Sequence, residues 1–157
     1  MSAQTPDALA RAFVKVGAGL EQNVGRALGM AGSLAVGHAK QTSMFHDRSA
    51  VLRNSIDYDG PVGSFSAGDM HITVTAGAEH ASYIEKGTRP HEIRPTFRKA
   101  LRWPIEGGYA FARIVRHPGT APRPFLEAAR DWTVPKLRDE LIPKAIELSF
   151  VQAGFRP

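Results

Sequence analysis

The chain has 157 residues, 43% of them hydrophobic, which is the size and apolar content of one domain with an ordinary core and excludes a wholly disordered chain. It contains no cysteine, which excludes disulfides and thiolate chemistry and favours the reducing cytoplasm. The net charge of +5 permits contact with nucleic acid or another acidic surface, but the basic residues are spread along the chain, as on a solvated surface.

The N-terminal region lacks the pattern of a secretory signal or a membrane span. Its first apolar stretch is interrupted by Asp7, Arg11 and Lys15. The longest uncharged run there, residues 27–39, is shorter than the about 20 apolar residues that cross a bilayer. We therefore expect a soluble protein that makes no membrane contact.

A long helix is predicted for residues 6–42. Thr5 is a suitable N-cap, Pro6 suits the first helical position, and Asp7 complements the positive end of the helix dipole. An apolar stripe recurs at intervals of three and four residues through Leu9, Phe13, Val16, Leu20, Val24, Leu28 and Ala31. At 1.5 Å per residue the helix would be about 55 Å long, so part of it should reach beyond its own core.

Glycines interrupt this stripe at positions 17, 19, 25, 29, 32 and 37. Each glycine inside a helix costs about 1 kcal/mol of stability relative to alanine, so some other interaction should offset them. Two explanations stay open. Either another helix, for example from a neighbouring subunit, approaches closely along the small face, or the helix breaks near Gly17 to Gly19.

The region from residue 50 to residue 117 is predicted to be rich in strands. Residues 51–56 suit either a helical turn or the entry to a first strand. Alternating side chains predict strands at 70–76 and 81–86, a short extended segment at 91–95, and a hairpin whose strands, 99–103 and 110–115, flank Gly107-Gly108. We expect these strands to form one antiparallel sheet.

Two loops of similar composition should organise the fold. The first is Gly87-Thr88-Arg89-Pro90, where glycine can take a positive φ at little cost and the preceding strand can end. The second runs from His117 to Phe125 and contains Gly119-Thr120 before it enters the C-terminal helices.

The C-terminal region is predicted to be helical, with an interruption near residues 133–135 because proline cannot donate the interior hydrogen bond. Phe125 should be a buried plug where the second loop meets the helix, and Trp103, Phe111 and Trp132 are expected in the core. The predicted fold class is α+β: a long N-terminal helix, a central antiparallel β-sheet, and C-terminal helices packed on the sheet. We expect a single domain, 1–157, made of an N-terminal helix (1–45), a β-rich core (50–117) and C-terminal helices (124–152).

The sequence predicts no catalytic, cofactor or metal site. None of the six histidines has a recognised metal-ligand spacing, and neither a Gly-x-Ser-x-Gly turn nor a phosphate-binding Walker loop occurs. Glu85 would suit acid or base catalysis if it were buried, but a carboxylate at a strand end more often pairs with an arginine. We therefore expect a protein that is not an enzyme.

The order of three short motifs resembles the phage proteins related to HK97 gp10, a family of minor tail components and neck or tail-completion proteins. Residues 51–56, Val-Leu-Arg-Asn-Ser-Ile, resemble the family's Leu-Arg-x-Ser-Ile step. Residues 81–88 resemble its tyrosine and glutamate followed by Gly-Thr. His117-Pro118-Gly119-Thr120 with Pro124-Phe125-Leu126 resembles its Pro-Gly-Thr and Pro-Phe-Leu segment.

The resemblance implies a structural virion protein that joins head and tail at the neck of a long-tailed phage, as a tail-completion or connector ring. Its partners would be other neck and tail proteins (head-closure or stopper protein, tail terminator, tail tube) and further copies of itself in a hexameric ring. It would reside in the virion, and in the host cytoplasm during assembly, without cofactors. If DNA passed through the lumen of the ring, non-specific contacts with its phosphates would explain the net positive charge of the protein.

The interface of such a ring should involve the long helix and the two Gly-Thr loops, because loops on a rigid scaffold carry many binding residues. The candidate interface residues are Arg53, Glu85, Gly87, Thr88, Arg89, His117, Gly119, Thr120, Arg123 and Phe125. Three alternatives remain: a tail terminator or head-closure ring protein, a small basic DNA-binding module, and an enzyme with a site at Glu85, His91 and His117.

Overall fold

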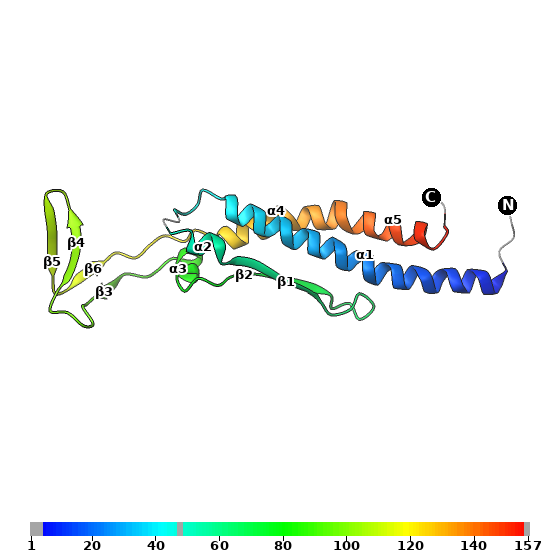
Figure 1. Ribbon diagram of the computed structural model, residues 1–157, viewed down its shortest axis with the longest axis horizontal. Helices are drawn as coiled ribbons and strands as arrows, with labels where there is room; N and C mark the ends of the chain where they lie inside the picture. The colour runs from blue at the N-terminus through cyan, green and yellow to red at the C-terminus, as the bar shows by residue number, and fades with distance from the viewer. Residues whose placement is uncertain (1–4, 47–48, 156–157) are drawn as a thin grey trace. The chain divides into compact units, whose positions relative to one another are not determined.

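The computed structural model describes residues 5–46 and 49–155 and forms two compact units (Figure 1). Unit 1 comprises residues 1–78 and 125–157, and unit 2 comprises residues 79–124. Unit 1 contains α1 (Pro6–Gln41), α2 (Val51–Asn54), β1 (Ile56–Val62), β2 (His71–Ala76), α4 (Phe125–Lys136), the π-helical segment η1 (Leu137–Leu141) and α5 (Ile142–Gln152). Unit 2 contains α3 (Ala81–Lys86), β3 (His91–Ile93), β4 (Leu101–Ile105), β5 (Gly108–Ala112) and β6 (Val115–His117). The α+β class is confirmed.

The predicted N-terminal helix is confirmed as α1, which has 36 residues. The Thr5 hydroxyl accepts a hydrogen bond from the Ala8 backbone N–H at 3.4 Å, and Pro6 occupies the start of the helix. Asp7 lies in the first turn, where its carboxylate complements the helix dipole. The local sequence therefore determines where this helix begins.

Two of the six glycines of α1, Gly19 and Gly32, are explained by close packing within the chain, and the helix is continuous through Gly17 and Gly19. A Cβ atom at Gly32 would come within 2.5 Å of the Tyr58 ring, and one at Gly19 would lie 3.2 Å from the Ser149 Cβ atom. Both neighbours belong to unit 1, one on β1 and the other on α5. The predicted break is not observed.

The core of unit 1 forms around α1. Val24, Ala27 and Leu28 on α1 are buried against Ala145 of α5, and Met70 and Ile72 of the β2 region pack on the same cluster. A polar contact lies beside it, where the Asn23 Nδ2 donates to the Ser149 Oγ at 2.9 Å. The C-terminal helices thus pack on α1 along the chain (Figure 1), and not on a sheet as predicted. The wide apolar stripe of α1 offers a longer surface than any two-stranded ladder.

The C-terminal helix changes its winding two residues after Pro135. α4 continues through Pro135 and ends at Lys136. The π-helical segment η1 follows from Leu137 to Leu141, and α5 then starts with Pro143 in its first turn. Proline removes a backbone donor, and a wider turn is one way to accommodate the lost i→i−4 bond. The predicted interruption near 133–135 is therefore displaced toward the C-terminus and is a change of winding instead of a break.

The strands form three separate two-stranded antiparallel ladders, β1–β2, β3–β6 and β4–β5. This corrects the prediction of one sheet. An alternating pattern identifies a strand but not its partner, and here β3 pairs with β6 on either side of the β4–β5 hairpin. In β1–β2, Ile56 and Tyr58 turn toward α1 while Asp57 and Asp59 are exposed.

Residues 81–86 form the helix α3 and not the predicted strand. Ala81 is buried and Ile84 is half-buried, whereas Ser82 and Tyr83 are exposed, which is the three-residue spacing of a helical face. A six-residue segment is too short for sequence periodicity to distinguish a helix from a strand. Gly87 ends the helix with a φ of 70°.

The aromatic predictions have mixed outcomes. Phe125 is completely buried and packs edge to face on Phe45, with ring centroids 4.9 Å apart, as expected of a plug. Trp103, Phe111 and Trp132, which were predicted in the core, are 39%, 66% and 40% exposed. The first two lie on the β4–β5 hairpin, and a ladder of two strands supplies no second layer that would bury them.

Candidate interaction site

The two Gly-Thr loops bind each other in unit 2. The backbone N–H of Thr88 donates to the Thr120 carbonyl at 3.0 Å, and the N–H of Thr120 donates to the Thr88 carbonyl at 3.1 Å. The two threonine hydroxyls also lie 3.0 Å apart. We call residues 87–89 and 119–121 the Gly-Thr bridge. The prediction that these loops organise the fold is confirmed for unit 2.

Both glycines of the Gly-Thr bridge are required by its geometry. Gly87 has a φ of 70° and Gly119 a φ of 87°, which L-residues with a side chain rarely adopt. A Cβ atom at Gly87 would overlap the Thr120 carbonyl oxygen, and one at Gly119 would overlap the Thr88 carbonyl oxygen. Each loop therefore needs its glycine so that the other loop can approach.

A pair of histidines lies beside the Gly-Thr bridge. His91 and His117 face each other across the β3–β6 ladder, with ring centroids 5.1 Å apart. The His117 Nδ1 lies 3.0 Å from the donating N–H of Gly119, so in the neutral ring the proton is on Nε2. The His91 Nδ1 is 2.9 Å from the carbonyl oxygen of Arg89, to which it donates.

This arrangement orients the two rings without making a metal site. The Nε2 of His117 can bind a metal only if the proton moves from Nε2 to Nδ1. That tautomer would lose the hydrogen bond that Nδ1 accepts from the Gly119 N–H. Within residues 5–46 and 49–155, no group of three or more metal-ligating side chains is placed to hold an ion. The two rings stack at a paired position of the β3–β6 ladder.

A hollow of about 370 Å³ lies next to the histidine pair. Tyr83, Thr88, His91, Thr120 and Arg123 are among its lining residues. The backbone N–H of Arg123 donates to the Ile84 carbonyl at 2.8 Å, which fixes the second loop to α3. The hollow thus has a rigid floor and an exposed tyrosine and arginine at its rim.

The structure brings together seven of the ten predicted interface residues. Gly87, Thr88, Arg89, His117, Gly119, Thr120 and Arg123 surround the Gly-Thr bridge. Glu85 lies just before them, half-buried on α3.

The other two predicted residues, Arg53 and Phe125, lie in unit 1 and support its core. Arg53 donates to backbone carbonyls at the end of α1, those of Lys40 and Thr42, and its guanidinium lies 4.8 Å from the centroid of the Phe45 ring. Phe125 contacts the other side of this cluster through Phe45. These two residues would act on an interface through packing and not by direct contact.

Sequence reasoning missed the exposed apolar surface of unit 2. Its large members are Tyr83, Ile93, Phe97, Trp103, Ile105, Tyr109, Phe111 and Ile114, and Phe97 is 98% exposed. In unit 2, all of whose residues the structure describes, Ala81 is the only hydrophobic residue that is buried. The available signal was that large apolar side chains occur on both faces of the predicted hairpin, Trp103 and Ile105 on one face and Tyr109 and Phe111 on the other. Exposed apolar surface of this kind marks an interaction site.

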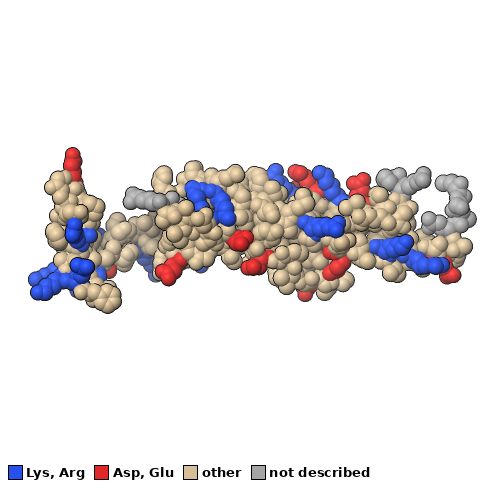
Figure 2. All heavy atoms as spheres, in the orientation of Figure 1, with Lys and Arg blue, Asp and Glu red and all other residues tan. Residues whose placement is uncertain are grey.

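The positive charge of the protein also belongs to unit 2. Nine lysines and arginines against four glutamates give residues 79–124 a net charge of +5, whereas the remaining residues carry eleven charges of each sign. Figure 2 shows Lys and Arg side chains gathered around the β4–β5 end of unit 2. Glu92 is shared by Arg94 at 2.8 Å and Arg116 at 3.7 Å. Unit 2 is therefore both apolar and basic at its surface.

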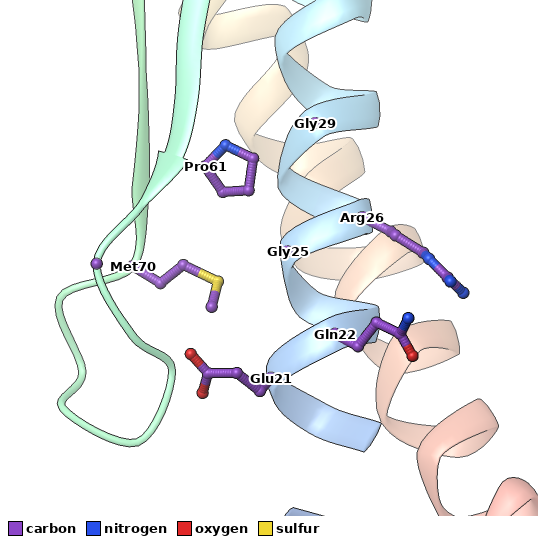
Figure 3. Close-up of a pocket in the computed structure, with 8 residues that line it drawn as sticks. Glu21, Gln22, Gly25, Arg26, Gly29, Pro61 and Met70 are labelled. Atoms are coloured by element: carbon purple, nitrogen blue, oxygen red, sulfur yellow. The ribbon is translucent and has the colours of Figure 1, made fainter. Parts of the chain in front are cut away.

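A second hollow, of about 470 Å³, lies in unit 1 between α1 and the β1–β2 hairpin. In Figure 3 the Glu21 carboxylate and the Met70 side chain point toward this space, whereas Gln22 and Arg26 point away from it. The Glu21 carboxylate accepts a hydrogen bond from the Phe65 backbone N–H at 3.1 Å. Glu21 thus fastens the hairpin loop to α1.

The chain has no significant match among curated proteins or solved structures. In the described part of the chain, no helix is both long enough and apolar enough to cross a membrane.

One family model matches residues 7–87, and its description reads "Bacteriophage HK97-gp10, putative tail-component". The match begins in the first turn of α1, includes β1, β2 and α3, and ends at the first glycine of the Gly-Thr bridge. A tail component is part of the virion and contacts other virion proteins. The matched segment covers half of the sequence, and the chain belongs to the HK97 gp10-like family of bacteriophage tail components.

Proposed function

We propose that this protein joins head and tail at the neck of a tailed phage, as a tail-completion or connector component. The observation that carries the proposal is the surface of unit 2, which has exposed apolar and basic side chains around a rigid Gly-Thr bridge in a member of a tail-component family. Such a surface suits binding to proteins, because a two-stranded ladder is marginally stable until another element covers it.

The protein would act as a ring, with six copies in the virion. A ring requires a heterologous interface, in which different faces of each subunit meet and the rotation closes. The long helix and the Gly-Thr bridge are the proposed faces, and the proposed neighbours are the head-closure or stopper protein, the tail terminator and the tail tube. Assembly would take place in the host cytoplasm.

The role is structural and not catalytic. The competing enzyme hypothesis places a site at Glu85, His91 and His117, but His117 and His91 are both engaged by backbone groups. Replacing Glu85 with Gln tests that hypothesis, since the substitution keeps the shape and removes the ionisable group. Unchanged folding and assembly of the Glu85→Gln protein would remove the main support for catalysis.

A second candidate function is non-specific DNA binding, which the charge of unit 2 favours. DNA passing through a ring lumen would meet these cations through its phosphates, without base recognition. Binding of duplex DNA by the isolated protein, measured over a range of salt concentrations, tests this function. A steep fall of log K with log salt supports it, and a slope near zero excludes it. A tail terminator or head-closure ring remains an alternative within the structural class.

The experiment that tests the neck function is a deletion of the gene in its phage or prophage. The particles are examined by negative-stain electron microscopy, and purified protein is added back to the extract. We expect filled heads beside unjoined tails, and joined particles after addition of the protein. Normal particles without the gene would refute the proposal.

A further inference from the structure

The charges of this chain are separated along the sequence into two adjacent segments of opposite sign. Residues 54–85 contain five aspartates and glutamates and no lysine or arginine. Residues 86–123 contain nine lysines and arginines and two glutamates. The net charges are therefore −5 and +7. Residues 54–85 are thus 32 consecutive residues without a basic side chain, and each segment carries charges of predominantly one sign.

Three of the five acidic residues of the first segment lie on or beside the β1–β2 ladder. Asp57 and Asp59 are exposed and pair across the ladder with Thr75 and Thr73, while Ile56 on the other side is buried. Asp69 is exposed at the other end of the hairpin loop, where its Oδ1 accepts from the Ser64 N–H at 2.8 Å. We call Asp57, Asp59 and Asp69 the acidic face.

Four of the nine basic residues of the second segment lie on or beside the β4–β5 hairpin, near its open end. Leu101 pairs with Ala112, so Arg98, Lys99 and Arg113 lie at the same end of the ladder. The Arg102 guanidinium lies 3.6 Å from the centroid of the Tyr109 ring, which holds it flat on the hairpin. We call Arg98, Lys99, Arg102 and Arg113 the basic face.

No ion pair within the described residues neutralises either face. The ion pairs formed within residues 5–46 and 49–155 involve none of the seven residues of the two faces. Both faces also lie on two-stranded ladders, which have unpaired strand edges. Exposed aromatic side chains, Phe111 and Tyr109, accompany the arginines, whereas threonines accompany the aspartates.

We infer that the basic face of one copy docks on the acidic face of the next copy. The inference rests on the proposed ring and identifies which surfaces meet in it. Arginine forms bidentate, charge-assisted hydrogen bonds with carboxylates, and complementary charges steer association and determine register. The contact is heterologous, as ring closure requires, because the two faces come from different parts of the chain. It would also cover the apolar hairpin.

The test uses two charge-reversed proteins in the complementation assay for particle joining. The first carries Arg98→Glu, Lys99→Glu, Arg102→Glu and Arg113→Glu, and the second carries Asp57→Arg with Asp59→Arg. Each protein alone places like charges at every contact and should lose joining. A mixture of the two restores opposite charges at every contact of an alternating ring, so joining should return. A single protein with all six substitutions should also join.

The control reverses four exposed charges outside both faces, Arg11→Glu, Lys15→Glu, Arg26→Glu and Lys144→Glu, which changes the net charge as much as the basic-face variant does. Joining should be retained. All variants concern exposed side chains, and thermal unfolding followed by circular dichroism verifies that each one folds.

The outcomes separate this inference from the neck function. If wild-type protein is not needed for joining, the neck function fails. If wild-type protein joins particles but the mixture of reversed proteins does not, the copy-to-copy docking is overturned. If only the basic-face reversal matters, the basic face meets DNA or another acidic partner, and the docking is overturned too.

A cross-link provides a second readout in joined particles, because the natural chain has no cysteine. Asp59→Cys and Arg102→Cys are introduced together, and a short bismaleimide is added. Docking predicts a ladder of covalent multimers in denaturing gels, absent from each single-cysteine protein. Cross-links confined to single chains, or no cross-link, would contradict the inference.

Discussion

At the scale of single residues, the Gly-Thr bridge depends on Gly87 and Gly119 for two separate reasons, a positive φ and a close approach of the opposite carbonyl group. Gly87→Ala and Gly119→Ala should each cost about 1–3 kcal/mol of local stability. We expect faster amide hydrogen exchange at Thr88 and Thr120, which is measured by NMR.

The matched control is Gly107→Ala, because Gly107 has a φ of 82° but open space around it. It introduces backbone strain of about 1 kcal/mol without a steric overlap. Exchange at the Gly-Thr bridge should stay as in the wild type. Equal exchange rates in all three variants would show that the two loops do not constrain each other.

At the scale of elements, α1 contains glycines with opposite roles. Gly32 lies against the Tyr58 ring, so Gly32→Ala should destabilise unit 1 by about 1–3 kcal/mol despite the better helix propensity of alanine. A Cβ atom at Gly37 would meet no other described part of the chain within 4 Å, so Gly37→Ala should stabilise by about 0.5–1 kcal/mol. Urea unfolding measures both free energies.

The decisive result is that the free energy of unfolding falls in Gly32→Ala and rises in Gly37→Ala. If both variants are stabilised, β1 does not pack on the small face of α1 in solution. A smaller side chain at position 58 should recover part of the loss in Gly32→Ala, because it removes the atoms that the new methyl group meets.

At the scale of the whole molecule, the two units differ in where their large apolar side chains lie. Unit 1 buries many of them in a core, whereas most of those of unit 2 are exposed. Phe111 is exposed on β5, so Phe111→Ser should change the free energy of unfolding by less than about 0.5 kcal/mol but reduce particle joining. Phe125 is buried, and Phe125→Ala should cost about 3–5 kcal/mol. Unfolding and complementation, measured on the same two variants, distinguish an interface residue from a core residue.

Unchanged joining with Phe111→Ser would remove the hairpin from the proposed interface. The control variant matters here because loss of joining by Phe125→Ala follows from unfolding alone. A protein that folds normally and does not join is the expected behaviour of the hairpin variant.

The elements that the sequence predicted well are those with local causes. The start of α1 follows from Thr5, Pro6 and Asp7, and the hairpin turn follows from Gly107 and Gly108. Composition identified the two Gly-Thr loops as organising elements, but their pairing with each other appears only in the structure. The helix α3 was missed because six residues do not establish a period, and the burial of Trp103 was misjudged because no second layer covers its ladder.

The sequence by itself determined the α+β class, the long first helix, the plug at Phe125 and the family, since caps, periodicity and short motifs act within a few residues. Only the tertiary structure decided that the C-terminal helices pack on α1, that the strands form three ladders and that unit 2 lacks a core. These properties depend on which apolar faces meet across long sequence separations. Alternation and charge identify which side of a helix or strand is apolar or charged. Which other element packs on that side depends on the shape and apolar area of every element in the fold.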